Sequence, residues 1–283
     1  MAIQRIAAFT KDGTGGNPAG VMIADIHPPV ADMQRIAAEI GYSETAFAMP
    51  ALGSAPDGAW RVRYFSPESE VPFCGHATIA LGAALARAHG AGRYALVLNG
   101  ANITVEAVAD GGGFAVTLQS PPTRSAPADP ALIAEALALF GYADHDLDPR
   151  LPPHRANAGA AHLVIALRTR ARLADMAYDL DAGRRFMQAH GLVTVAFVVA
   201  DTARHFHVRN AFASGGVMED PATGAAAAAL AGLLRDTGWP HGGQITIWQG
   251  EDMGALSELV ATLSDAPGSS VAVSGRAAWI VDT

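Results

Sequence analysis

The residues best suited to chemistry form a turn, Cys74, Gly75 and His76, between a segment that predicts a strand and one that predicts a helix. Residues 62–65 are β-prone, and the Ala- and Leu-rich residues 77–88 are typical of a helix. Glycine at the turn allows the backbone to approach a ligand closely. Because a helix N-terminus offers unpaired N–H groups and a partial positive charge, the turn is suited to holding a carboxylate or an enolate oxygen.

A glutamate, Glu44, stands between Ser43 and Thr45, near the start of a mostly apolar segment, 42–49, that predicts a strand. A carboxylate in such a place is either an exposed charge at the end of a strand or a buried functional group. These residues taken alone favour the exposed interpretation.

The segment around the turn recurs in the second half of the chain. The recurring positions are Glu70, Pro72 and Gly75, which reappear as Glu219, Pro221 and Gly224, and Val62-Arg63, which reappears as Val208-Arg209. Two long copies indicate a duplicated domain rather than a solenoid. The copies differ chemically, because the first half carries Glu44 and the second carries Asp220.

Size and composition fit a two-domain globular enzyme: the chain has 283 residues, of which 50% are hydrophobic and 16% are charged. A net charge of −8 without a basic cluster argues against nucleic acid as a partner. We expect a cytoplasmic protein that does not bind membranes, because no apolar run spans a bilayer, no signal-peptide pattern opens the chain, and only one cysteine is present. The histidines are scattered and no cysteines are paired, so no metal site is predicted. No Walker or dinucleotide-binding glycine motif is found.

The pattern of elements predicts two domains, 1–120 and 121–276, with a final strand at about 277–283 that packs back on the first. The proline-rich segment 120–130 predicts the linker, and the glycine-rich segment 11–18 predicts a flexible turn. Besides 77–88, predicted helices cover 31–40, about 130–140 with Asp129 as N-cap and Gly141 as the stop, and 180–190. Predicted strands cover 3–9, 21–23, 60–65, 94–98, 103–109, 114–118, 193–200, 244–249, 259–263, 271–273 and 277–281.

Five segments together resemble the phenazine-biosynthesis PhzF-like isomerases, which share the fold of diaminopimelate epimerase and the proline racemases. The segments are Gly16–Val21, Ser43–Phe47, Arg63–Pro67, Glu70–Thr78 and Glu219–Gly224. They follow the family's order and span nearly the whole chain. The resemblance implies an α/β (α+β) fold of two similar domains, each a mixed, curled β-sheet around a central helix, with the active site in the cleft between them.

The resemblance also implies a cofactor-free isomerase that moves a proton at a carbon next to an activating group. In the family's isomerase, a glutamate moves a proton within a dihydro-hydroxyanthranilate ring. By motif that glutamate matches Glu44, which makes Glu44 functional and reverses the isolated interpretation, while Asp220 and His76 match the assisting residues. Residues expected to contact the small carboxylate substrate are Asn17, Cys74, Gly75, Gly224 and Ala225. A homodimer is expected because relatives form one.

Three positions depart from the family's pattern. Ala225 replaces a serine that usually follows Thr-Gly, and Ala255 stands where the family often has arginine. Cys74 occupies the place of one of the two catalytic thiols of the racemase relatives, but the second place holds Thr223. Two alternatives therefore stay open: an amino-acid epimerase, racemase or dehydratase that uses Cys74 and Thr223, and a non-catalytic ligand-binding protein on the same fold.

Overall fold

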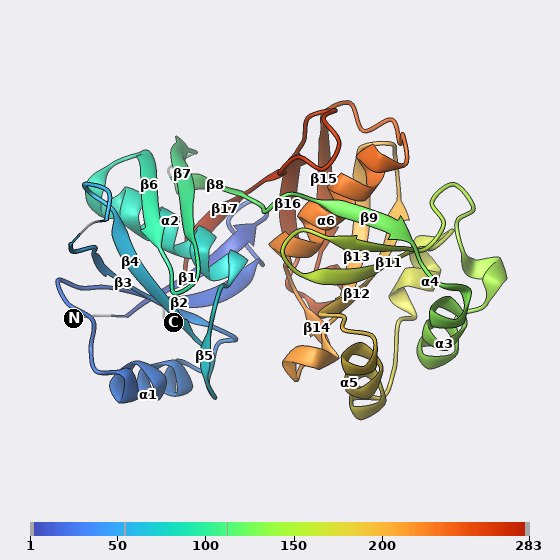
Figure 1. Cartoon of the computed structure of the whole chain (residues 1–283), viewed down its shortest axis with the longest axis horizontal. Helices are drawn as coiled ribbons and strands as arrows, with labels where there is room; N and C mark the ends of the chain where they lie inside the picture. Colours follow the sequence, from blue (N-terminus) through green and yellow to red (C-terminus); the bar gives the residue numbers. More distant parts are fainter. Residues whose placement is uncertain (1–2, 54, 112, 281–283) are drawn as a thin grey trace. The chain divides into compact units, whose positions relative to one another are not determined.

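The computed structural model describes residues 3–53, 55–111 and 113–280 (Figure 1). The chain divides into two compact units. The first takes in residues up to Gln119 together with the segment from Ser274 onward, and the second comprises Ser120–Val273. Both units contain strands and helices, and the predicted mixed α/β class is confirmed.

The first unit contains two helices within its described residues, as predicted. They are α1 (Val30–Ile40) and α2 (Gly75–His89). The strands are β1 (Gln4–Thr10), β2 (Asn17–Ile23), β3 (Thr45–Pro50), β4 (Trp60–Phe65), β5 (Glu70–Val71), β6 (Gly92–Val97), β7 (Asn102–Asp110), β8 (Gly113–Gln119) and β17 (Ala272–Trp279), which enters this unit at Ser274.

The strands of the first unit form a closed ring around α2. Hydrogen bonding runs from β1 to β2, β3, β4, β6, β7 and β8, and then through β17 back to β1. Helix α2 contacts β1, β2, β3, β6, β7 and β8 and lies among them in Figure 1. Every residue from His76 to Ala86 is buried. Where a strand approaches most closely the helix needs a small residue, since a Cβ at Gly82 would lie 2.6 Å from Cγ1 of Val116.

The second unit also packs its most buried helix, α6 (Gly224–Asp236), against several strands. Its other helices are α3 (Pro130–Phe140), α4 (Arg170–Ala174) and α5 (Leu180–Ala189), with single turns η1 (Asp144–Asp146), η2 (Ala213–Gly215) and η3 (Glu251–Met253). Its strands are β9 (Arg124–Pro127), β10 (His154–Asn157), β11 (Ala161–Ala166), β12 (Thr194–Ala200), β13 (His205–Ala211), β14 (Glu219–Asp220), β15 (Gln244–Gln249) and β16 (Ser257–Thr262).

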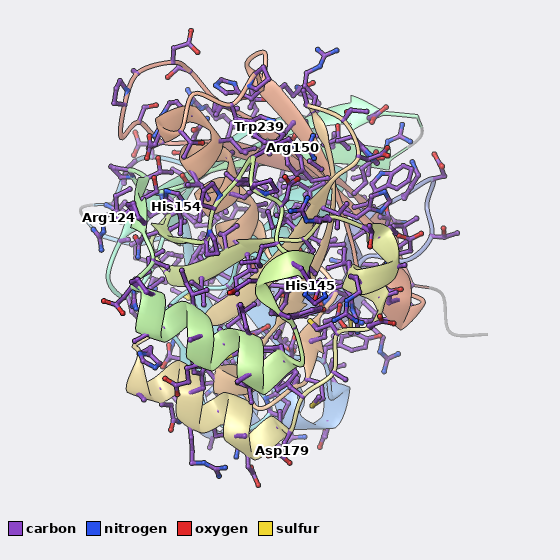
Figure 2. The ribbon with its side chains drawn as sticks, turned by 90° about the vertical axis from the view of Figure 1, so that its right-hand side faces the viewer. Arg124, His145, Arg150, His154, Asp179 and Trp239 are labelled. Carbon is purple, nitrogen blue, oxygen red and sulfur yellow. The ribbon has the colours of Figure 1, made fainter. Side chains whose placement is uncertain are left out.

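The sheet of the second unit is covered by helices on both faces. Helix α6 packs on β9, β10, β11 and β16, while an aromatic core on the other face joins Phe140 of α3, Phe186 of α5 and Phe197 of β12. The predicted caps of α3 are confirmed, because Asp129 accepts from the N–H of Ala131 (2.8 Å) and Gly141 ends the helix at φ 69°. Figure 2 shows α3 and α5 on this face, with Asp179 at the N-terminal end of α5, where its side chain accepts from the N–H of Ala182.

Two sequence predictions need correction. The proline-rich segment 120–130 contains a strand, β9, which pairs with β10 and ends at Pro127. The two strands predicted at 271–273 and 277–281 form one strand, β17, and the predicted residues 281–283 lie outside the described part of the chain. Gly275 does not interrupt β17 but allows a close approach, since a Cβ there would lie 2.3 Å from Cδ1 of Phe9. The φ of Phe9 is 63°, at an irregularity in the pairing of β1 with β17.

Within the described residues, no helix is long and apolar enough to cross a membrane.

A fully buried histidine of the second unit, His162, makes folding stability sensitive to acid. His162 is fully buried on β11, where its Nδ1 lies 2.6 Å from Oγ1 of Thr194, and burial lowers its pKa to about 4. Above pH 6.5 both folded and unfolded states carry neutral imidazole, but between pH 6.5 and about 4 only the unfolded state takes up the proton. We expect the free energy of unfolding to fall by about 3 kcal/mol across this window.

Urea unfolding at several pH values measures this dependence. The slope between pH 6.5 and 4 should shrink in His162→Gln and persist in His145→Gln, since the side chain of His145 is 85% exposed. An unchanged slope in His162→Gln would show that other groups cause the acid sensitivity.

Candidate active site

Three predicted site residues lie together in the first unit. Glu44 directly precedes β3, Cys74 is the N-cap of α2, and His76 is the second residue of that helix. Oε2 of Glu44 lies 3.4 Å from Sγ of Cys74 and 3.4 Å from Nε2 of His76. Sγ of Cys74 is also 3.4 Å from Nδ1 of His76. Carboxylate, thiol and imidazole thus touch one another, and each can give or take a proton.

The cluster is shielded but reachable from solvent. The side chain of Glu44 is 17% exposed and that of His76 7%, and Cys74 is buried. The isolated interpretation of Glu44 as an exposed strand-end charge was therefore wrong. Ser43 had no predicted role, and its Oγ lies 3.3 Å from Nε2 of His76. Its place beside Glu44 in the motif was the available signal.

A buried hydrogen-bond chain holds the first turn of α2. The hydroxyl of Tyr64, on β4, lies 2.6 Å from Oγ1 of Thr78, which donates to the carbonyl of Cys74 at 2.6 Å. Burial raises the pKa of Tyr64, so its hydroxyl stays protonated and donates to Thr78. These hydrogen bonds join the N-cap of α2 to β4 and thereby fix the position of the Cys74 thiol.

The second unit brings together a different set at the matching turn. Asp220 ends β14, and its Oδ2 accepts from the hydroxyl of Thr223, the N-cap of α6. Nε2 of Gln249 donates to the carbonyl of Asp220 (2.6 Å) and to Oγ1 of Thr223 (3.0 Å). The side chain of Asn210 also donates to Oγ1 of Thr223. Gln249 and Asn210 had no predicted role, and they come from strands distant in the sequence.

The remaining predicted residues flank these two sets. Asn17 is buried at the start of β2, the strand whose Gly20 N–H donates to the carbonyl of Glu44 (3.2 Å). Gly75, Gly224 and Ala225 lie in the first turns of α2 and α6, where N–H groups have no intrahelical partner. Ala255, in place of the family's arginine, contributes only its backbone, with its N–H bonded to the carbonyl of Gly250 (3.0 Å).

Each unit also carries an arginine–glutamate pair beside its helical turn. Arg63 on β4 donates two hydrogen bonds to Glu70 on β5, at 2.8 and 2.6 Å. Arg209 on β13 holds Glu219 on β14 in the same way, with Nη2 at 2.5 Å from Oε2. Both residues of each pair belong to the recurring positions of the sequence, which was a signal for this contact.

The cluster of Glu44, Cys74 and His76 could also hold a cation. Glu44, Cys74 and His76 each offer a ligand atom, and these atoms lie within 4.8 Å of one another. The set mixes oxygen, sulfur and nitrogen donors, which a zinc ion accepts. A cluster with this composition is equally suited to acid/base chemistry without a metal.

Comparisons with known proteins place the chain in a family. The model of the PhzC-PhzF family, described as phenazine biosynthesis-like protein, matches residues 6–283, and the chain belongs to this family. The chain is 30% identical to the uncharacterized isomerase YddE of Escherichia coli O157:H7, over 97% of this chain and 95% of that one. It is 33% identical to trans-2,3-dihydro-3-hydroxyanthranilate isomerase of Pseudomonas aeruginosa, over 96% and 95%.

The fold agrees with this assignment. The crystal structure of a PhzF-family phenazine biosynthesis protein from Bacillus anthracis superimposes with a TM-score of 0.85 at 19% identity, covering 99% of this chain and 96% of that one. The predicted family, fold and isomerase class are confirmed.

The Arg209–Glu219 pair should be important for stability. The two side chains are only 13% and 5% exposed, so Glu219→Gln leaves a buried guanidinium without its main counter-charge. We expect a loss of about 3 kcal/mol in the free energy of unfolding. As a matched control, Glu39→Gln removes an exposed partner of Arg35 on α1 and should cost less than about 0.5 kcal/mol. Equal losses in both variants, measured by urea unfolding, would contradict this ranking.

Proposed function

We propose that this isomerase moves a proton on carbon in a small carboxylated substrate, with Glu44 as the base and proton carrier. The observation that carries the proposal is the contact of one Glu44 oxygen with both the thiol of Cys74 and the imidazole of His76. A partly buried carboxylate with polar neighbours can take a proton from carbon and return it at another position.

We assign His76 to hydrogen bonding or proton relay with Glu44. Its ring touches Glu44, Cys74 and Ser43, so a proton taken up by the carboxylate has an adjacent acceptor. Asp220 is proposed as the second acid of the reaction, on the strength of its family motif. The hydroxyl of Thr223 donates to this carboxylate and fixes its orientation.

We assign substrate contact to the backbone at the two helical turns. The N–H groups at Gly75 and at Gly224-Ala225 would bind the substrate carboxylate or the negative charge that develops on it. Asn17 and Cys74 complete the proposed contacts. The loss of a serine hydroxyl at Ala225 and of arginine at Ala255 favours a substrate that differs from that of the Pseudomonas relative.

The thiol-based alternative is weaker on geometry. An epimerase with two bases needs an acidic group at each of two positions, but Thr223 is an alcohol whose hydroxyl already donates to Asp220. Cys74 therefore lacks a partner thiol at the matching turn. It remains a candidate base only because it touches Glu44 and His76.

Solvent deuterium exchange tests the proposal. The wild-type protein is incubated in D2O with a panel of cyclic and acyclic carboxylates and amino acids that begins with trans-2,3-dihydro-3-hydroxyanthranilate, and deuterium in the compounds is measured by mass spectrometry. On any compound that exchanges, Glu44→Gln should lower the rate by at least about 100-fold, since it removes the general base. Glu39→Gln, which changes an exposed glutamate on α1, should leave the rate unchanged.

Further variants separate the alternatives. Asp220→Asn should slow exchange, and Cys74→Ser should slow it less than Glu44→Gln. If Cys74→Ser abolishes exchange while Glu44→Gln retains it, the thiol mechanism replaces the carboxylate mechanism. Compounds that bind without any exchange would favour a non-catalytic ligand-binding protein.

We also propose that the protein works as a homodimer, as its family resemblance implies, and in the cytoplasm, as its single cysteine indicates. Sedimentation equilibrium of the full chain should then give twice the mass of 29.1 kDa. A single species at the monomer mass at micromolar concentration would reject the dimer.

A further inference from the structure

A second cluster of titratable side chains lies in the second unit, separate in the sequence from all residues of the proposed reaction. It consists of His205 and His207 on β13 and Asp201 in the turn before that strand. A ligand atom from each of the three lies within 4.8 Å of the others. Residues two apart on a strand project from the same face, and the intervening Phe206 is fully buried in the core. The strand therefore presents both imidazoles side by side.

The hydrogen bonding of this cluster is incomplete. Nδ1 of His205 lies 3.4 Å from Oδ2 of Asp201. Its other ring nitrogen, Nε2, is buried and has no hydrogen-bond partner in the described part of the chain. The two ring nitrogens point in different directions, and Nδ1 is the one that faces Asp201. A cation bound by both residues would therefore take Nδ1, in place of the hydrogen bond between them.

The second imidazole is oriented by a carboxylate behind it. Nδ1 of His207 lies 3.2 Å from Oε2 of Glu251, which also accepts from Arg170 at 2.9 Å. A carboxylate that fixes the ring of a histidine is the usual second layer around metal-binding imidazoles.

Packing restricts both rings. The indole of Trp248, on the neighbouring strand β15, meets the rings of His205 and His207 at 87°, with centroid distances of 4.3 and 5.5 Å. Rings held in this way lose little conformational freedom when they bind a ligand. The positive charge of Arg170, which lies beside Glu251, is balanced by ion pairs with both Glu251 and Asp252.

We propose that Asp201, His205 and His207 form a binding site for one divalent zinc-like cation. Two imidazole nitrogens and one carboxylate oxygen are a donor set that suits Zn²⁺ or Co²⁺, whereas Mg²⁺ and Ca²⁺ prefer oxygen donors alone. Three protein ligands leave a fourth position for water or an outside ligand. The metal would join the β12–β13 turn, through Asp201, to the face of β13.

Calorimetric titration of the metal-free full chain with ZnCl₂ tests the proposal. We expect one Zn²⁺ per chain, with Asp201→Asn and His207→Gln each weakening binding by at least about tenfold. The side chain of Asp201 is 61% exposed, so its substitution leaves the core intact and decides the question even if the histidine variant fails to fold. Asp265→Asn and His145→Gln, at exposed positions of the same unit, are matched controls and should bind as the wild type does (Figure 2 shows His145).

Glu44, Cys74 and His76 could also bind zinc, so a second experiment must distinguish the two sites. Co²⁺ bound at Asp201, His205 and His207 should give a visible spectrum without the near-ultraviolet thiolate charge-transfer band that Cys74 would produce. Saturating Zn²⁺ should raise the melting temperature of the wild type and of Cys74→Ser but not that of Asp201→Asn. No uptake by the wild type, undiminished binding in Asp201→Asn, or a thiolate band that disappears in Cys74→Ser would each overturn the proposal.

Discussion

The burial of helix α2 inside a ring of strands is the constraint on which the acid/base cluster depends. Because six strands contact the helix, its side chains must fit the space that those strands leave, and Gly82 packs against Val116 where even a methyl group would collide. The same enclosure fixes the first turn of the helix. Cys74 and His76 are thereby held against the start of β3, where Glu44 stands. A helix packed on one face only could shift along its axis and lose these contacts.

The ion pairs add a second restraint at the same turns. Arg63 joins β4 to β5 through Glu70, and Arg209 joins β13 to β14 through Glu219. Both short strands lead directly into the buried helix of their unit. A bidentate pair resists rotation as well as separation. These pairs therefore set the direction in which the chain enters each helix, and with it the position of the candidate site residues at the turn.

Features of the fold that depend on residues close in the sequence were predicted correctly. The N-cap Asp129, the stop at Gly141 and the small-residue pattern of α2 act within a few positions, and each prediction was confirmed. Strand pairing depends on residues far apart in the sequence and was harder to predict. The prolines of segment 120–130 predicted an irregular linker, but part of this segment forms β9, which pairs with β10. The break expected at Gly275 was wrong because the glycine makes room for Phe9, which the sequence does not place beside it.

The same division applies to the candidate site. Family motifs identified Glu44, Cys74 and His76, which the structure brings into contact. Residues that reach the second turn across the sheet, such as Gln249, carried no local signal. The spacing of His205 and His207 was visible in the sequence, but the approach of Asp201 and Glu251 to these rings depends on the turn before β13 and on η3.

The duplication shows how one architecture can carry unequal chemistry. The pairing of β2 with β3 matches Gly20 to Thr45, and the parallel pairing of β11 with β12 matches His162 to Thr194. The residue before the strand is Glu44 in the first unit and Val193 in the second. At the helical turns, Cys74 and His76 correspond to Thr223 and Ala225, while Val71 corresponds to Asp220. Besides the paired Glu70 and Glu219, each unit therefore has an acid of its own near the buried helix: Glu44 just before β3 in the first unit and Asp220 on β14 in the second. The packing and ion pairs that both copies share do not require these two acids. The packing and ion pairs that the two halves share stabilise both units. The proposed acid/base residues stand at positions where the two halves differ, so it is at these positions that we look for the residues of the reaction.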